Sequence, residues 1–195
     1  MPITLTAICI SAAMLIESSI PVSQNEILND FRDSDGSWGE LAAEAAPEVA
    51  QFGQLVGLWQ IETRSMDRQG QWSDGAGAYW AWKYILGGHA VQDLYLQIDA
   101  AGKDTRITQL RIYDPKTNNW NISWINTIEA RHGNFIAHSE DGTLIMTDPN
   151  STAGYPVQIV FSDISDDRWV WEYQIMRSDS DQWLAVSIFT ATRLE

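Results

Sequence analysis

From residue 56 onward, apolar and polar residues alternate in short segments, which is typical of strands that have one buried face. In several segments the alternating apolar residue is tryptophan, as in Trp80-Ala81-Trp82 and Trp169-Val170-Trp171. Side chains two positions apart share a face of a strand, so these segments predict stripes of large rings. The predicted strands are roughly 56–66, 76–86, 89–98, 105–113, 119–128, 133–139, 143–147, 156–163, 168–177 and 183–193.

Turn sequences separate these segments, and no helical pattern lies between them. Gly87-Gly88 and Asp141-Gly142 predict tight hairpin turns with positive φ. Short strands joined by hairpins form antiparallel sheets. A flat sheet of about ten strands would leave two long edges open, so we predict closure into a barrel.

The residues before the strands have a different composition. Asn25–Phe31 and Glu40–Ala46 are rich in helix formers, and Pro47 can open a short helix that runs through Phe52. We therefore divide the chain into residues 1–23, a partly helical segment over 24–51, and a barrel domain over 52–195.

Residues 1–23 match a secretion signal. Ile3–Ile16 is an apolar run too short to span a bilayer comfortably, and the small residues that follow offer a cleavage site, although no Lys or Arg precedes the run. We expect a cleaved signal peptide and a periplasmic or secreted protein; a buried N-terminal segment is the alternative. Cleavage would remove Cys9, the only cysteine.

The net charge of the chain restricts the classes of partner that it can bind. The chain has 26 acidic and 12 basic residues, a net charge of -14, and no basic cluster. This acidic protein would repel nucleic acids and anionic membrane surfaces. We expect neither a nucleic-acid partner nor a membrane partner after leader removal.

Three motifs in order carry a resemblance to a known superfamily. They are Phe52-Gly53-Gln54-Leu55-Val56-Gly57-Leu58-Trp59, then Tyr84-Ile85-Leu86-Gly87-Gly88-His89, then Ile112-Tyr113-Asp114-Pro115 with Trp120 beyond. Together they resemble the calycin superfamily, and in particular a lipocalin-like bacterial family of unknown function. The resemblance implies an all-β fold: an antiparallel calycin-like (lipocalin-like) β-barrel of about ten strands with an internal cavity. It also implies that Trp59 closes one end of the barrel and that Gly57 lets the chain bend into the first strand.

Ring stripes on a sheet predict either a ring-filled core or a ring-lined pocket. If the rings point inward, they would surround a small apolar or aromatic ligand. Arg111 and Tyr113, which share a strand face, would then be polar anchors for a ligand carboxylate. If the row Val170, Glu172, Gln174 and Met176 points inward instead, exposed rings would favour a partner subunit in a homodimer. The candidate ligand-binding residues are Trp80, Trp82, Tyr84, Arg111, Tyr113, Trp124, Trp171 and Tyr173.

Other chemistry has little support in the sequence. A strand carboxylate such as Asp93 or Glu172 could serve as a general acid or base among rings. His89, His132 and His138 lack the close spacing of a zinc site, and no phosphate loop or dinucleotide fingerprint occurs. We expect no metal and no cofactor. We expect the barrel to bind a small apolar or aromatic molecule, as a carrier or for sequestration. An isomerase, cyclase or lyase and a filled-barrel interaction module are the alternatives.

Overall fold

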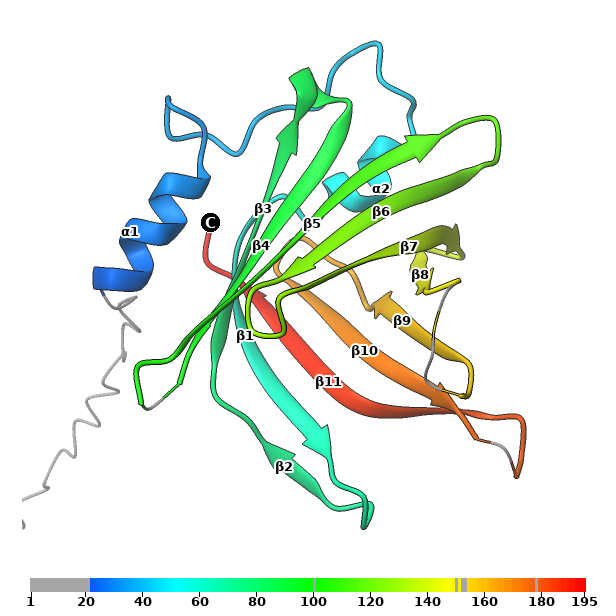
Figure 1. The fold of residues 1–195 in the computed structure, drawn as a ribbon. Helices are drawn as coiled ribbons and strands as arrows, with labels where there is room; N and C mark the ends of the chain where they lie inside the picture. The colour runs from blue at the N-terminus through cyan, green and yellow to red at the C-terminus, as the bar shows by residue number, and fades with distance from the viewer. Residues whose placement is uncertain (1–21, 100, 150, 152–153, 178) are drawn as a thin grey trace, which may run out of the picture.

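The computed structural model describes residues 22–99, 101–149, 151, 154–177 and 179–195, and it shows a closed antiparallel barrel of ten strands (Figure 1). Each barrel strand pairs with its neighbours in the chain, and β11 pairs with β1 to close the sheet. The expected signal peptide, apart from Val22 and Ser23, lies outside the described residues. The strands of the barrel are β1 Gly57–Met66, β3 Ala78–Ile85, β4 Ala90–Ile98, β5 Asp104–Asp114, β6 Asn119–Asn126, β7 Arg131–Glu140, β8 Thr143–Thr147, β9 Val157–Ser162, β10 Arg168–Met176 and β11 Trp183–Arg193.

The strands follow the alternating segments of the sequence closely, so the predicted calycin-like barrel is confirmed as a fold. One short strand was not predicted, β2 (Trp72–Asp74), which pairs with the end of β1. The two predicted hairpin turns have the expected positive φ, although the connection between β3 and β4 spans four residues and contains the short 3₁₀ helix η1 (Leu86–Gly88). Gly87 and Gly88 have φ of 64° and 90°, and Asp141 and Gly142 have φ of 47° and 80°.

The N-terminal segment contains one helix on the outside of the barrel. This helix, α1 (Val22–Phe31), buries Leu28 against Leu58, Ala81 and Leu96, which face outward from β1, β3 and β4 (Figure 1). The apolar patch that these side chains form on the outer surface is therefore covered by the chain itself.

Glu40–Ala46 is not a helix, although its composition favours one. The segment crosses the β3–β4 turn, where Ala42 N–H donates to the carbonyl of Gly88 at 3.3 Å. A Cβ at Gly88 would lie 2.3 Å from both Ala42 N and Glu40 O. This close backbone approach fixes a non-helical path, so the tertiary contact overrides the helix propensity.

A second helix, α2 (Val49–Gly53), plugs one end of the barrel. Its Phe52 is fully buried and meets Trp120 edge-on, with ring centroids 4.9 Å apart. Beside it, Trp59 is also fully buried and its indole N–H donates to the carbonyl of Leu55 at 2.7 Å. The guanidinium of Arg193 lies 4.0 Å from the centre of the Trp59 ring and donates to the carbonyl of Val56 at 2.9 Å. These contacts join the end of β11 to the beginning of β1 and close the barrel at this end.

Candidate functional site

The large rings of the barrel strands point inward. Trp80, Trp82 and Trp169 are 0–3% exposed and belong to one continuous core cluster. Trp171 and Tyr173, further along β10, are partly buried against the same cluster. The stripes that the sequence predicted therefore line the interior, and the alternate row of β10 faces outward.

The rings fill the end of the barrel that α2 plugs. Trp80 contacts Trp82 and Trp169, each at 5.3 Å between centroids, and Phe161 lies 5.6 Å from Trp169. Most of these pairs are edge-on or tilted, the arrangements that aromatic quadrupoles favour. This half of the interior is closely filled.

A charged cluster lies within these rings. Arg111 Nη2 donates to Asp93 Oδ2 at 2.8 Å and to Gln109 Oε1 at 2.7 Å. The backbone N–H of Gln109 donates to Asp93 Oδ1 at 2.7 Å, so both carboxylate oxygens are hydrogen-bonded. The guanidinium lies 4.3 Å from the centre of the Trp82 ring and 4.9 Å from that of Phe52. These contacts hold the cation between two ring faces and one carboxylate.

Burial and the partner's charge shift the pKa values of this ion pair in opposite directions. Asp93 and Arg111 are both 0% exposed. Burial raises the pKa of Asp93 above its usual value, and the charge of Arg111 opposes that shift. Burial likewise lowers the pKa of Arg111, and Asp93 opposes it. The pair is net neutral when both groups are ionised, which is how a low-dielectric interior tolerates two charges.

The other end of the interior is partly open to solvent. Trp171 stacks on Phe189 at 4.3 Å between centroids with an interplanar angle of 23°, and Phe189 stacks on Tyr95 at 5.8 Å and 18°. Trp171 and Phe189 are only partly buried, although they pack against the core. Trp124 and Phe135, on β6 and β7, meet edge-on at 6.4 Å and are also partly exposed. Inward-facing rings that retain exposure form an accessible apolar surface inside the barrel.

The residues predicted to bind a ligand divide into three groups. Trp80, Trp82 and Arg111 are fully buried at the centre. Trp124, Trp171 and Tyr173 belong to the partly open end. Tyr84 and Tyr113 lie at the plugged end.

The side chains of Tyr84 and Tyr113 contact neighbouring residues at the plugged end. The Tyr84 hydroxyl approaches Gly53 of α2 so closely that a Cβ there would lie 1.9 Å from it. The Tyr113 hydroxyl donates to Asn118 at 2.6 Å, and its ring packs on Trp120. The structure therefore separates the Tyr113 hydroxyl from the Arg111 guanidinium, although the two side chains share a strand face.

Three residues of the site were not predicted from the sequence: Gln109, Tyr95 and Phe189. Gln109 lies two positions before Arg111 and thus on the same strand face, a signal that was present in the sequence. Tyr95 and Phe189 are isolated rings in their strands, and only the cross-strand register brings them together. Asp93 was recognised as an ionisable strand residue, but its partner could not be read from the spacing.

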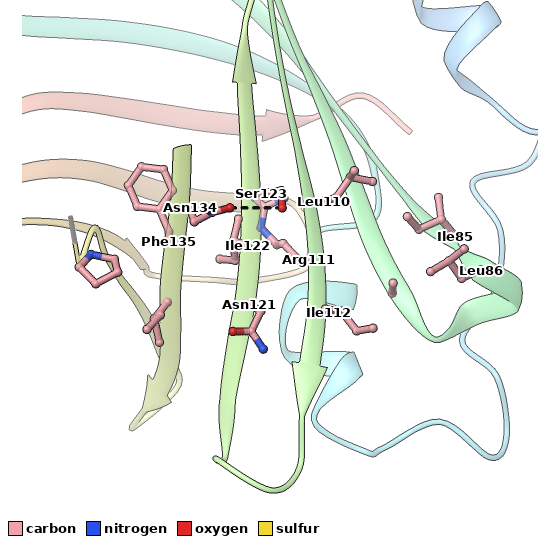
Figure 2. A pocket seen from close by; sticks show the side chains of 13 residues that line it. Ile85, Leu86, Leu110, Arg111, Ile112, Asn121, Ile122, Ser123, Asn134 and Phe135 are labelled. Atoms are coloured by element: carbon pink, nitrogen blue, oxygen red, sulfur yellow. Dashed lines mark hydrogen bonds between the residues drawn. The ribbon is translucent and has the colours of Figure 1, made fainter. Parts of the chain in front are cut away.

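The outer surface has a separate apolar groove of about 600 Å³ (Figure 2). Leu110 and Ile112 alternate with the inward residues of β5 and are 40% and 50% exposed. Ser123 and Asn134, on β6 and β7, share a hydrogen bond of 3.5 Å on the same surface. Arg111 borders the groove, but its side chain is fully buried. The groove is lined by Ile85, Leu86, Ala90, Leu110, Arg111, Ile112, Asn121, Ile122, Ser123, Asn134, Phe135, Ile136 and Pro149.

Metal and membrane features are not found in the part of the chain that the structure describes. No group of three or more His, Cys, Asp or Glu side chains in that part could hold a metal ion. Across the described ranges, no helix combines the length and the apolar character needed to cross a bilayer.

Comparisons with known proteins support the fold. No family model matches the sequence, and no curated protein matches it. Among solved structures, the chain is similar to the S-type phycobiliprotein lyase CPES from Guillardia theta, with a TM-score of 0.50 and 12% identity over 74% of this chain and 90% of that chain. It also matches a redesigned β-barrel, with a TM-score of 0.42 and 10% identity over 78% of this chain and 100% of that one. At this identity, the likeness to the lyase shows a shared antiparallel calycin-like barrel.

Proposed function

We propose that this protein binds a small, mainly apolar, ring-containing molecule inside the barrel, as a carrier or for sequestration, and that it is a member of the calycin superfamily. The observation that carries the proposal is the contrast between the two ends of the interior. One end is plugged by α2 and filled with rings, whereas the other presents stacked but partly exposed rings. A ligand that inserted between the exposed rings would gain apolar burial and stacking without unfolding the core.

The experiment is a tryptophan fluorescence titration of the purified protein with a panel of ring compounds. The matched variants are Trp171→Ala, which removes an inward ring, and Trp183→Ala, which removes a ring that is 39% exposed at the start of β11. We expect saturable quenching by at least one compound, with affinity lowered about tenfold or more in Trp171→Ala and retained in Trp183→Ala. Equal affinities in the two variants would show that Trp171 does not contribute to ligand binding.

An enzyme is the second candidate, because the interior holds a buried carboxylate beside a guanidinium. A carboxyl group with a raised pKa is suited to general acid or base chemistry in an isomerase, cyclase or lyase. The similarity in fold to a phycobiliprotein lyase adds a reason to test bond-forming or bond-breaking chemistry on a bound ring compound. Turnover that follows a sigmoidal pH profile and is lost in Asp93→Asn would favour this candidate over a simple binding protein.

We also propose that residues 1–23 are an export leader and that the mature protein is periplasmic or secreted. The support is the apolar run Ile3–Ile16 followed by small residues. Intact-mass analysis of exported protein should show a chain that begins near residue 24. Export with Met1 retained, or protein confined to the cytosol, would contradict this proposal.

A further inference from the structure

The buried polar atoms inside the barrel that lack a protein partner are donors. Among the described residues, Arg111 Nε and Nη1 and the indole N–H groups of Trp82 and Trp169 are buried without a hydrogen-bond acceptor from the protein. Among the barrel residues that the structure describes, no buried side-chain acceptor is left unpaired in this way. Unpaired buried donors cost free energy, so the interior is suited to a molecule that supplies acceptors.

Gln109 is the member of the charged cluster that a molecule would reach first. It retains 6% exposure, whereas Asp93 and Arg111 retain none. In the strand register, Gln109 lies directly opposite Trp124, a ring of the partly open end. On its own strand it stands between Arg111 and Ile107, and Ile107 pairs with Tyr95 of the ring stack. The amide therefore lies at the boundary between the filled half and the accessible half.

The hydrogen bond from Arg111 fixes which group Gln109 can offer. Arg111 Nη2 donates to Gln109 Oε1, so the amide oxygen is turned toward the guanidinium and the Nε2 amino group is directed away from it. An amide NH₂ donates hydrogen bonds and cannot accept them. Gln109 thus presents a donor toward the accessible half of the interior.

The charge of the cluster selects a neutral acceptor. Asp93 already balances the charge of Arg111 at 2.8 Å, so an incoming carboxylate would add an uncompensated negative charge to a buried site. A carbonyl oxygen accepts hydrogen bonds without that cost. With its charge already balanced by Asp93, Arg111 is better suited to position Gln109 than to anchor a ligand carboxylate as the sequence predicted.

From these contacts, and resting on the proposed ligand-binding function, we infer that the ligand is a ring compound with a neutral carbonyl oxygen, which accepts a hydrogen bond from Gln109 Nε2. Arg111 acts as a positioning residue because it holds the Gln109 amide in the orientation that exposes its donor. The exposed rings of the open end provide most of the affinity, and Gln109 provides the selectivity for a carbonyl group.

Three compounds with one ring framework test this inference: fluorene, 9-fluorenone and fluorene-2-carboxylate. Dissociation constants are obtained for the full protein by calorimetry or from tryptophan titration midpoints. We expect fluorenone to bind about tenfold more tightly than fluorene, the effect of one buried hydrogen bond, and the carboxylate to bind no more tightly than fluorene. Fluorenone that binds no better than fluorene would overturn the inference of a carbonyl acceptor. Tightest binding by the carboxylate would overturn the inference that the acceptor is uncharged. Failure of all three compounds and of a wider ring panel would instead count against the proposed function itself.

Two variants and one control assign the effect to Gln109. Gln109→Leu removes the amide, and Gln109→Glu keeps an acceptor for Arg111 but removes the donor. Both should abolish the preference for fluorenone over fluorene while fluorene affinity changes little. Gln92→Leu is the matched control, because Gln92 faces outward from β4 and its amide bonds to Thr108 Oγ1 at 3.2 Å. A fluorenone preference that survives in folded Gln109→Leu or Gln109→Glu protein would show that Gln109 is not the donor.

Discussion

Arg111 donates to Asp93 across 2.8 Å at a position where neither side chain is exposed to solvent. Each charge depends on the other, because a single ion in the ring-filled interior would have no counter-charge. The pair joins β4 to β5 below the partly open end, and it sets the electrostatic character of the candidate ligand site.

Removing one charge of this pair should destabilise the fold strongly. Arg111→Met leaves Asp93 without its counter-ion and leaves Asp93 Oδ2 and Gln109 Oε1 without their donor, so we expect a loss of about 3–5 kcal/mol in the free energy of unfolding. Chemical denaturation followed by tryptophan fluorescence measures this change. Arg106→Met is the control, since Arg106 pairs with Asp104 on the surface and exposed pairs contribute about 0–1 kcal/mol. A loss within about 1 kcal/mol in Arg111→Met would show that Asp93 does not need this partner.

The pH dependence of stability should carry a signature of Asp93. Because burial raises its pKa in the folded protein above the ordinary value of 3.8, the folded chain binds the proton at a higher pH than the unfolded chain. The Asp93 contribution to stability therefore increases as pH falls through the folded pKa toward 3.8, and it is smallest at higher pH. Subtracting the stability profile of Asp93→Asn from that of the parent should isolate this increase. A difference that decreases over the same acidic range would contradict the raised pKa.

Trp59 should be a main determinant of barrel closure. Trp59→Ala removes a fully buried ring, its hydrogen bond to Leu55 and the surface on which Arg193 lies. We expect a destabilisation of about 3–5 kcal/mol, the usual range for a buried large aromatic. Thermal unfolding of this variant beside Trp183→Ala is the measurement. If both variants melt within a degree or two of the parent, Trp59 does not close the barrel.

The adjacent glycines of the β3–β4 turn offer a matched comparison. Both have positive φ, but a Cβ at Gly87 would meet no atom within 4 Å, whereas one at Gly88 would collide with the backbone of Glu40 and Ala42. Gly87→Ala should cost only the strain of a left-handed residue, about 1–2 kcal/mol, and Gly88→Ala clearly more. Denaturant midpoints of the two variants test this order. Equal losses would mean that the Glu40–Ala46 segment is not held against the turn.

The sequence was informative about the barrel because strand periodicity is a local property. Alternation around Trp80 and Trp169 gave both the strands and the ring stripes, and hairpin turns such as Asp141-Gly142 gave the antiparallel order. The helix expected over Glu40–Ala46 was wrong because a contact with a residue more than forty positions away determines its path.

The site itself depended on register, which single-sequence reasoning could not supply. Strand alternation showed that Gln109, Arg111 and Tyr113 share a face. It could not show that Asp93 lies opposite Gln109 and accepts a hydrogen bond from the guanidinium of Arg111. Strand alternation also could not show that the Tyr113 hydroxyl turns toward Asn118 at the plugged end. These relationships arise from cross-strand pairing and from side-chain rotamers, which only the folded chain specifies.

Native mass spectrometry of the purified protein, recorded with and without an added ring compound from the fluorescence panel, tests the central claim most directly. We expect a mass increase equal to one ligand per barrel, either carried through purification or gained on addition. This increase should be retained in Trp183→Ala and reduced in Trp171→Ala. Spectra that show only the bare chain with every compound, together with no saturable quenching, would contradict a ligand-binding interior and favour a filled-barrel interaction module.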